Sequence, residues 1–528
     1  MRTASSRETT AKASSSPKPR RNSADETVRH FQRPPVATGG RFSAFSRDPK
    51  MNRILQLVLA CVVMCVSSAA ATDRPNIVFV LTDDQAPTAA GFAGNTQLKT
   101  PNMDRLAREG AVLTNSFVAT PVCSPSRASL ATSRYGSELG IIDWINPRAE
   151  PQHGLNPNTV TWMELLQEAG YATGLFGKWH LGTADRFHPT LSGYDEFMGI
   201  RSGGCPPKDP VLEIDGHDVK TNGFTVDLVT DHALQFIETH REDPFLVSLH
   251  YREPHAAWLP TREEDWEPYK DLDPLLPEPD FPKLDVEKVK QFTREYYASC
   301  ASVDRNLGRV LETLDRLGLA ENTVVVFTSD HGYHNGHHGL WYKGNAHWML
   351  TELPPKQWEH IDRKRRPNLF DQALRVPTVV RWPAAIEPGT VVKQTVSNLD
   401  WYPTLLQIAG VELPAEITVR GESIVPLLKG EPVEWDNSLY AEYSMRHGAT
   451  VDMRAWRTPE WKLMIDFAHE GRRELYHLAD DPAESQNLID SDDPEASRIK
   501  QECETNIRDG LAEIRDPQLV DVWMEEAK

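Results

Sequence analysis

A short segment around Cys123 contains residue types that could support chemistry. Pro121 and Pro125 restrain the backbone around the cysteine and leave few donors for sheet pairing. From Ser126 onward the pattern is helical, so we expect Cys123 at a helix N-terminus, where free N–H groups and the helix dipole favour an anion. A cysteine in such a turn is usually just buried or disulfide-bonded, and the alternative is a reactive group beside an anion site.

Two pairs of residues place carboxylates at the ends of apolar segments. Residues 76–81 and 323–329 are continuous apolar or β-branched runs, which are typical of strands buried on both faces. Asp83-Asp84 follows the first run, and Asp330-His331 follows the second. Open α/β sheets place their sites at the carboxyl ends of parallel strands. Several carboxylates gathered there would suit a hard cation, whereas two adjacent acids alone are more often a solvated turn.

A third candidate is residues 177–182, GKWHLG, directly after an expected strand at 171–176. Lys178 and His180 could simply be surface charges. Glycines at both ends of the stretch instead favour a tight loop that holds the two side chains over one point.

These segments together resemble the type I, formylglycine-dependent sulfatases of the arylsulfatase and glycosaminoglycan-sulfatase kinds. Residues 123–127 match the family's activating motif (Cys or Ser, any residue, Pro, Ser, Arg), and residues 177–182 match an active-site Lys–His stretch at every position. Residues 251–255 resemble a Pro-His segment that brings a second histidine, and residues 336–343 resemble a segment with a sulfate-contacting lysine. The matches follow the family order from about residue 74 to 490.

The resemblance implies a modified nucleophile and a metal site. A formylglycine-generating maturase would oxidise Cys123 to an aldehyde, whose hydrate attacks sulfur. One calcium ion would be bound at the ligand set Asp83, Asp84, Cys123, Asp330 and His331. Many relatives have Asn at the position of His331, and imidazole is a poor calcium ligand, so the aspartates are the stronger part of this prediction.

The resemblance also implies roles for the basic residues. Arg127 and Lys178 would hold the formylglycine hydroxyls and the sulfate oxygens, and His180 would assist the hydroxyl that later expels sulfate. His255 and Lys343 would lie on the leaving-group side, with His255 as the proton donor. His338 is either a substrate contact or a loop residue.

The implied fold is α/β and alkaline-phosphatase-like, with a large, mostly parallel sheet flanked by helices. A small C-terminal α+β subdomain with an antiparallel sheet would follow. We therefore expect a catalytic domain at 73–415 and the subdomain at 416–528. Helices are expected at 226–240 and 286–317, and residues 258–285, rich in Pro, Asp and Glu, are expected to be a surface excursion.

Residues 345–366 are an apparent insertion relative to the family pattern, starting beside Lys343. They contain Trp348 and Trp358, suited to stacking on sugar rings, and a basic run that includes Arg363 and Arg365. They are either a solvated loop that touches no substrate or a recognition loop near the pocket mouth that steers an anionic glycan.

The net charge of −19 argues against binding to nucleic acid or to anionic membranes. Residues 1–50 are basic and poor in apolar residues, and we expect an untranslated or disordered extension there. Residues 51–72 have the layout of a secretory signal peptide and are too short for a stable membrane span. We therefore expect a periplasmic or secreted protein, with no membrane span in the mature chain.

The favoured function is hydrolysis of sulfate monoesters, with a sulfated carbohydrate as substrate. One alternative is a phosphate or phosphonate ester hydrolase of the same fold, although such enzymes prefer Thr or Ser nucleophiles and His-rich zinc sites. Another is a non-catalytic binder of sulfated glycans, which would require Cys123 to remain unmodified.

Overall fold

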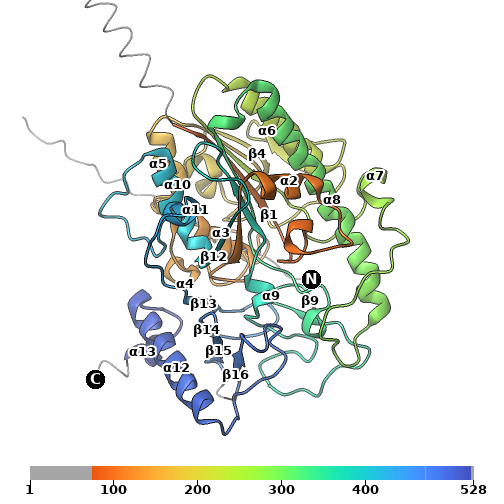
Figure 1. The fold of residues 1–528 in the computed structure, drawn as a ribbon, viewed down its shortest axis with the longest axis vertical. Helices are drawn as coiled ribbons and strands as arrows, with labels where there is room; N and C mark the ends of the chain where they lie inside the picture. Colours follow the sequence, from red (N-terminus) through yellow and green to blue (C-terminus); the bar gives the residue numbers. More distant parts are fainter. Residues whose placement is uncertain (1–73, 470, 525–528) are drawn as a thin grey trace, which may run out of the picture. The chain divides into compact units, whose positions relative to one another are not determined.

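A ten-stranded, mostly parallel sheet lies at the centre of the described residues, 74–469 and 471–524, in a computed structural model of the chain (Figure 1). The expected extension 1–50 and signal peptide 51–72 lie outside these residues. The strands follow one another in space in the order β12 (Thr390–Ser397), β2 (Ala111–Phe117), β11 (Thr378–Arg381), β8 (Thr323–Ser329), β1 (Asn76–Thr82), β7 (Phe245–His250), β3 (Ala172–Lys178), β4 (Glu196–Ile200), β5 (Val211–Ile214) and β6 (His217–Lys220).

The five strands β8, β1, β7, β3 and β4 are parallel to one another, and only β11 and β5 run against both of their neighbours. The predicted α/β fold class is therefore confirmed. These five strands are consecutive in the sheet, so their carboxyl ends lie at one edge.

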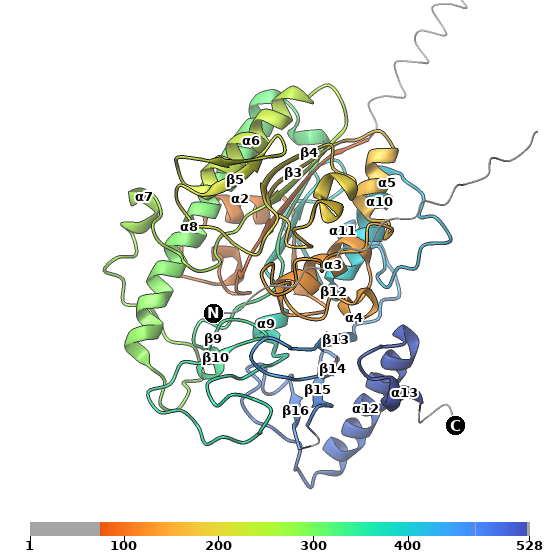
Figure 2. The same cartoon turned by 180° about the vertical axis from the view of Figure 1, so that it is seen from behind.

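Helices cover both faces of the sheet, as Figures 1 and 2 show from opposite sides. Val78 and Val80 of β1 pack in the core on one face, and Phe79 packs on the other face against Trp162 and Trp401. This two-sided burial explains the continuous apolar run of β1. The first face is covered by α2 (Pro101–Glu109), α6 (Thr225–Thr239) and α8 (Val286–Leu317), and the second by α3 (Cys123–Thr132), α5 (Trp162–Glu168), α10 (Trp401–Ala409) and α11 (Val425–Leu428).

The C-terminal part forms a second, antiparallel sheet. Its strands are consecutive: β13 (Leu439–Tyr443), β14 (Met453–Arg457), β15 (Trp461–Asp466) and β16 (Arg473–His477). Helix α12 (Pro494–Ile514) packs on it through Ile507 and Leu511, and α13 (Val520–Met524) follows. This confirms the expected antiparallel sheet, and the boundary at 415/416 stays a prediction. The remaining α-helices and strands are α4 (Gly136–Leu139), α7 (Glu263–Trp266), β9 (Leu340–Trp341), β10 (His347–Trp348) and α9 (Asp371–Leu374).

The expectation that residues 258–285 are purely a surface excursion is wrong. Trp258 and Tyr269 are buried in an aromatic cluster with Tyr296 and Tyr297 of α8. The segment is therefore anchored, because burying these rings removes a large apolar area from water. Within the described part of the chain, the cysteines form no disulfide, and no helix is both long and apolar enough to cross a bilayer.

Candidate active site

Three buried carboxylates gather at the end of the two central strands. Asp83 and Asp84 directly follow β1, and Asp330 directly follows β8. The strands are in register up to Thr82 and Ser329, and the Asp330 N–H donates to the Thr82 carbonyl over 2.9 Å. The sheet therefore delivers all three carboxylates to one point, as the strand pattern predicted.

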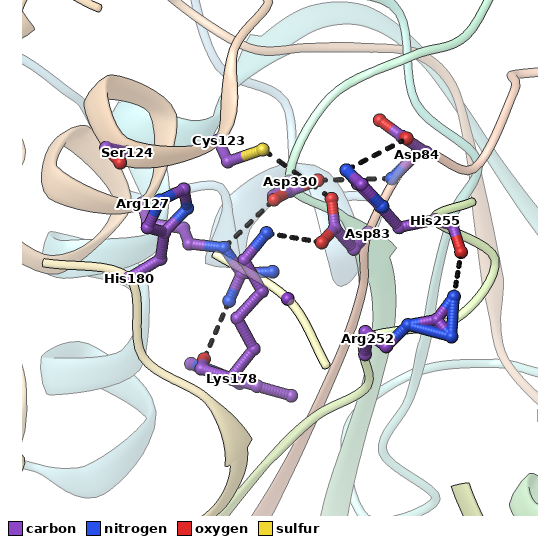
Figure 3. Close-up of polar contacts among 12 residues, drawn as sticks. Asp83, Asp84, Cys123, Ser124, Arg127, Lys178, His180, Arg252, His255 and Asp330 are labelled. Carbon is purple, nitrogen blue, oxygen red and sulfur yellow. Dashed lines mark hydrogen bonds and ion pairs between the residues drawn. The ribbon is translucent and has the colours of Figure 1, made fainter. Parts of the chain in front are cut away.

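Cys123 is the first residue of α3, and every residue of that helix is buried. Its Sγ atom lies 2.9 Å from Lys343 Nζ, 3.4 Å from His331 Nε2 and 3.7 Å from Asp83 Oδ1. Figure 3 shows the thiol pointing from the helix end toward the carboxylates. The predicted helix N-terminus at Cys123 thus places its sulfur among charged groups of both signs.

Cations from three different segments neutralise the carboxylates. Lys178, the last residue of β3, forms an ion pair with Asp83. Arg127 Nε donates to Asp330 Oδ2 over 2.9 Å, and its Nη1 donates to the Lys178 carbonyl over 2.9 Å (Figure 3). Lys343 Nζ donates to Asp84 Oδ1 over 2.7 Å. Each carboxylate therefore has a lysine or arginine within hydrogen-bond distance.

The glycines around Lys178 and His180 are required by the backbone. Gly177 and Gly182 have φ values of 120° and 118°, a region that other residues rarely adopt. A side chain at Gly177 would also lie 1.9 Å from the His250 carbonyl oxygen of β7. His180 itself has φ 59°, a conformation that is uncommon outside glycine and recurs at functional sites.

His180 and His255 differ in their surroundings. The buried His180 has its Nε2 3.1 Å from the Ile145 carbonyl, and burial together with the charge of Lys178 lowers its pKa to about 4. His255 has a side chain that is 18 % exposed, and its Nε2 lies 3.8 Å from Asp84 Oδ2 and 3.4 Å from the Tyr342 hydroxyl. Burial also lowers the pKa of His255, although the Asp84 carboxylate opposes this shift.

Lys343 reaches the site from a hairpin. Strands β9 and β10 pair in register, and Lys343 lies in the loop between them. The side-chain amide of Asn368 donates to the Lys343 carbonyl over 3.0 Å, which fixes this loop from outside. A buried lysine is thereby held against Asp84 and Cys123.

The charges at the site shift the pKa values of its groups. Burial raises the pKa of the Cys123 thiol, but Lys178 and Lys343 outweigh burial and hold it well below its ordinary value. Burial and the nearby Asp83 charge raise the pKa of Asp330 to about 6. The site therefore favours negative charge on residue 123.

The residues present fit a hard cation. Possible ligand atoms of Asp83, Cys123, Asp330 and His331 all lie within 4.8 Å of one another, and the same holds for Asp83, Asp84 and His255. The buried Oδ2 of Asp84 accepts no hydrogen bond within the described chain, although it is an acceptor with free lone pairs. Carboxylate oxygens of this kind are the ligands that calcium prefers, whereas the His331 imidazole and the unmodified Cys123 sulfur suit it poorly.

The remaining predicted substrate residues do not join this cluster. His338, Trp348, Trp358, Arg363 and Arg365 all line a different cavity of about 590 Å³, and none of the described residues on its wall belongs to the cluster around Cys123. His338 packs on Phe370 and its Nε2 lies 3.0 Å from the Ala483 carbonyl. The recognition role expected for residues 345–366 stays a prediction.

The sequence did not single out two residues that touch the site. Arg252 is buried, and its guanidinium donates to the His255 carbonyl (Figure 3) and to the Ala257 carbonyl, the latter over 2.6 Å. Tyr342 provides the hydroxyl beside His255. Their positions next to His255 and Lys343 in the chain were the available signal, but a neighbour in sequence does not reveal a contact.

Comparisons with known proteins agree with this geometry. The sulfatase family model matches residues 75–411, and a model for the C-terminal region of N-sulphoglucosamine sulphohydrolase matches residues 357–513. The chain is 27% identical to N-acetylglucosamine-6-O-sulfatase of Bacteroides thetaiotaomicron, covering 79% of this chain and 83% of the relative. It is 30% identical to N-acetylgalactosamine-6-sulfatase of Mus musculus (72% and 71%) and 27% identical to the steryl-sulfatase of the same species (75% and 72%).

Solved structures share the fold. BT4656 in complex with its substrate D-glucosamine-2-N,6-O-disulfate superposes with a TM-score of 0.71 at 24% identity, covering 84% of this chain and 99% of that chain. Ps i-CgsB in complex with k-i-k-neocarrahexaose superposes with a TM-score of 0.66 at 25% identity, covering 82% and 92%. Since the sulfatase model spans more than half of a chain whose buried cysteine, carboxylates and cations converge as described, the protein belongs to the sulfatase family and is a sulfuric ester hydrolase.

Proposed function

We propose that this sulfatase removes sulfate from a sulfated carbohydrate, using formylglycine made from Cys123 and one calcium ion. The observation that carries the proposal is the position of the Cys123 sulfur, 2.9 Å from Lys343 Nζ and next to three buried carboxylates. An unmodified thiolate offers no second hydroxyl, so it could not release sulfate from itself in the way the family reaction requires. Formylglycine in its hydrated form supplies both the nucleophilic oxygen and that second hydroxyl.

Buried lysine and arginine side chains would neutralise the charge of the bound sulfate. The sulfate oxygens are anionic and repel a nucleophile, so the reaction needs positively charged groups that are fixed around them before it starts. Lys178, Lys343 and Arg127 are fully or almost fully buried, and each is fixed by a carboxylate. These groups bind and orient the sulfate without reorganising. Asp83, Asp84 and Asp330 would hold the calcium ion, which adds a further positive charge at the reacting oxygens.

The two histidines would move protons at different steps. His180 has a lowered pKa and is neutral at pH 7, so it can accept a proton from a hydroxyl at residue 123. His255 is partly exposed, and its Nδ1 lies 2.6 Å from the Ala256 carbonyl, which leaves Nε2 facing Asp84 and the open side. The nearby Asp84 carboxylate favours the imidazolium form of His255, in which Nε2–H can protonate a departing sugar oxygen.

The carbohydrate substrate is supported by the names of the relatives. Two of the relatives act on N-acetylhexosamine 6-sulfates by name, and the C-terminal model over residues 357–513 is that of an N-sulphoglucosamine sulphohydrolase. The sequence identity to a steryl-sulfatase is about the same as the identity to these carbohydrate sulfatases. Sulfate release should therefore be compared on sulfated N-acetylhexosamines and on a steryl sulfate. Faster turnover of the steryl ester would contradict a carbohydrate substrate.

The mass of the peptide that contains Cys123 tests the modification directly. Protein produced with a formylglycine-generating maturase should yield this peptide at the formylglycine mass, and the active fraction should follow the modified fraction. An active protein with only unmodified cysteine would overturn the proposed chemistry.

We also propose export to the periplasm or the medium, on the basis of the signal-like residues 51–72. Cell fractionation of a tagged chain starting at Met51 tests this proposal. A product that stays in the cytoplasm with its N-terminus uncleaved would contradict it.

A further inference from the structure

A cavity of about 590 Å³ lies beside the active centre, and its lining residues are different from those of the cluster around Cys123. Its wall combines residues from parts of the chain that are distant in sequence, among them the ranges 278–282, 337–348, 354–366, 370–375 and 482–485. A volume of this size is in the range of small-molecule sites. None of the catalytic candidates lines this cavity, so it needs an explanation separate from the reaction at Cys123.

The β9–β10 hairpin links the cavity to the active centre. Leu340 in β9 and Trp348 in β10 pair across the hairpin and both line the cavity, whereas Lys343 in the loop between them contacts Cys123. Since consecutive Cα atoms are 3.8 Å apart, the Cα atoms of Leu340 and Lys343 are separated by at most about 11 Å. A short oligosaccharide can span the distance between the two sites.

Two guanidinium groups on the cavity wall have no ion-pair or side-chain hydrogen-bond partner within the described chain. Arg365 and Arg375 are half-buried, and within the described chain neither forms an ion pair or donates a side-chain hydrogen bond. The other arginines of the same region are occupied. Arg366 donates twice to Glu474 over 2.7 Å, and Arg363 donates to the Leu353 and Pro354 carbonyls over 2.6 and 2.7 Å.

The acidic residues of the wall do not cancel these two charges. Asp371 is paired with Arg457 and Lys462 over 2.9 Å each, and Glu484 is paired with Lys462 over 2.7 Å. Glu278, Asp280 and Asp362 are exposed at the solvent side. In a chain with a net charge of −19, the inner wall therefore offers a local site for an anion.

Trp348 packs against a core cluster with part of its ring and keeps the rest exposed on the cavity wall. Trp348 and Phe281 are both half-buried and line the cavity, with ring centroids 6.1 Å apart. Trp358 is different, because Arg472 lies 4.8 Å and Arg366 5.8 Å from its ring centroid. Trp358 is thus part of the wall's structure, whereas Trp348 can stack on a ligand.

We propose that this cavity binds a sulfated sugar unit of the substrate other than the unit that loses its sulfate. Arg365 and Arg375 would bind the anionic group, since a guanidinium fork matches the paired oxygens of a sulfate. Trp348 would stack on the sugar ring, and the β9–β10 hairpin would keep this unit at a fixed distance from Cys123. The proposal rests on the carbohydrate substrate proposed above.

The test is a binding measurement that does not depend on turnover. The full chain carrying Cys123→Ala is titrated calorimetrically with a size-defined dextran sulfate oligosaccharide, with unsulfated dextran and sodium sulfate as comparison probes. Arg365→Gln with Arg375→Gln, and separately Trp348→Ala, should each weaken dextran sulfate binding about tenfold. Arg294→Gln is the matched control, because Arg294 is also half-buried and lies outside the cavity wall.

Each outcome decides the proposal. Equal affinities in the parent and the cavity variants would overturn it, as would absence of binding in the parent. Sodium sulfate bound as tightly as dextran sulfate would show a free-anion site instead of a sugar site. Thermal unfolding identifies any variant that fails to fold, and for those Arg365→Lys and Trp348→Phe serve as milder changes expected to retain part of the affinity. Failure of the carbohydrate assays with intact binding here would contradict the proposed function and the cavity's role in substrate binding, and would leave only a binding site for sulfated sugars.

Discussion

Lys343 Nζ lies 2.9 Å from the Cys123 sulfur and 2.7 Å from Asp84 Oδ1, although these residues are separated by 220 and 259 positions in the chain. The β9–β10 hairpin brings the lysine in, and the end of β1 supplies the aspartate. The ammonium group thus touches both the expected nucleophile position and a predicted metal ligand. It is placed to stabilise negative charge at either one.

Replacing Lys343 with Met should lower kcat for sulfate release by about 10²-fold or more, because a preorganised positive charge at the reacting oxygens is lost. The matched control is Arg454→Met, since Arg454 is equally buried and pairs with Asp516 in the C-terminal sheet, outside both the cluster around Cys123 and the cavity wall. The control should lose stability and keep its turnover at temperatures where it is folded. Equal losses of kcat in both variants would mean that Lys343 acts only on folding.

Calcium removal should lower both activity and melting temperature. Three carboxylates that share one buried site repel one another, and a cation bound only in the folded state adds to its stability. Calcium content, measured by elemental mass spectrometry, should fall after chelation and in Asp330→Asn. Asp304→Asn is the control, because this buried aspartate accepts the Met103 N–H over 2.8 Å at the start of α2. The control should lose stability and retain its metal, and unchanged metal content in Asp330→Asn would contradict the site.

Strongly patterned elements could be predicted from the sequence. The apolar runs of β1 and β8 are buried on both faces, and α8 ends at Gly318, whose φ of 70° is the left-handed cap that glycine favours. Asp83, Asp84 and Asp330 could be predicted to meet because they follow these strands. By contrast, β6 is exposed along its length and β9 has only two residues. Neither strand therefore shows the alternation of apolar and polar residues by which a strand is recognised in a sequence.

The contacts that individual side chains of residues 345–366 make could not be predicted. Arg366 looked like part of a basic run, yet it is committed to Glu474, 108 positions away. Trp358 looked like a stacking surface for a sugar, yet the guanidinium groups of Arg366 and Arg472 both lie over its ring. These pairings depend on how β16 and its neighbours pack against the loop, and local charge or aromatic content carries no information about that.

Arg252 should be a positioning residue for His255. Its guanidinium donates to the His255 and Ala257 carbonyls, and its side chain is buried, so Arg252→Gln should let the histidine segment shift. A misplaced proton donor matters most when the leaving group is a poor one. Turnover of an alkyl or sugar sulfate should therefore fall by about 10²-fold, and turnover of an activated aryl sulfate should fall much less.

His255→Ala provides the reference for this prediction, because it should show the same dependence on the leaving group. Combining it with Arg252→Gln should add little further loss, since both changes act through one proton donor. Additive losses, or equal losses on good and poor leaving groups, would assign Arg252 a purely structural role. Arg252→Lys should recover part of the activity.

Asp400 should make stability depend on pH. Burial raises its pKa to about 7, although its carboxylate accepts the Ser397 and Glu422 N–H groups over 2.7 and 2.9 Å. Between about pH 4 and pH 7 the folded state keeps the proton that the unfolded chain releases. Each unit of rising pH in this window therefore lowers the free energy of unfolding by up to about 1.4 kcal/mol, with no further change above pH 7.

The variant Asp400→Asn resembles the neutral acid, so its stability should not show this slope. Its melting temperature relative to the parent should therefore rise from pH 5 to pH 8. Asp492→Asn, at an exposed position, should show no such trend, and a pH-independent difference for Asp400→Asn would contradict the raised pKa.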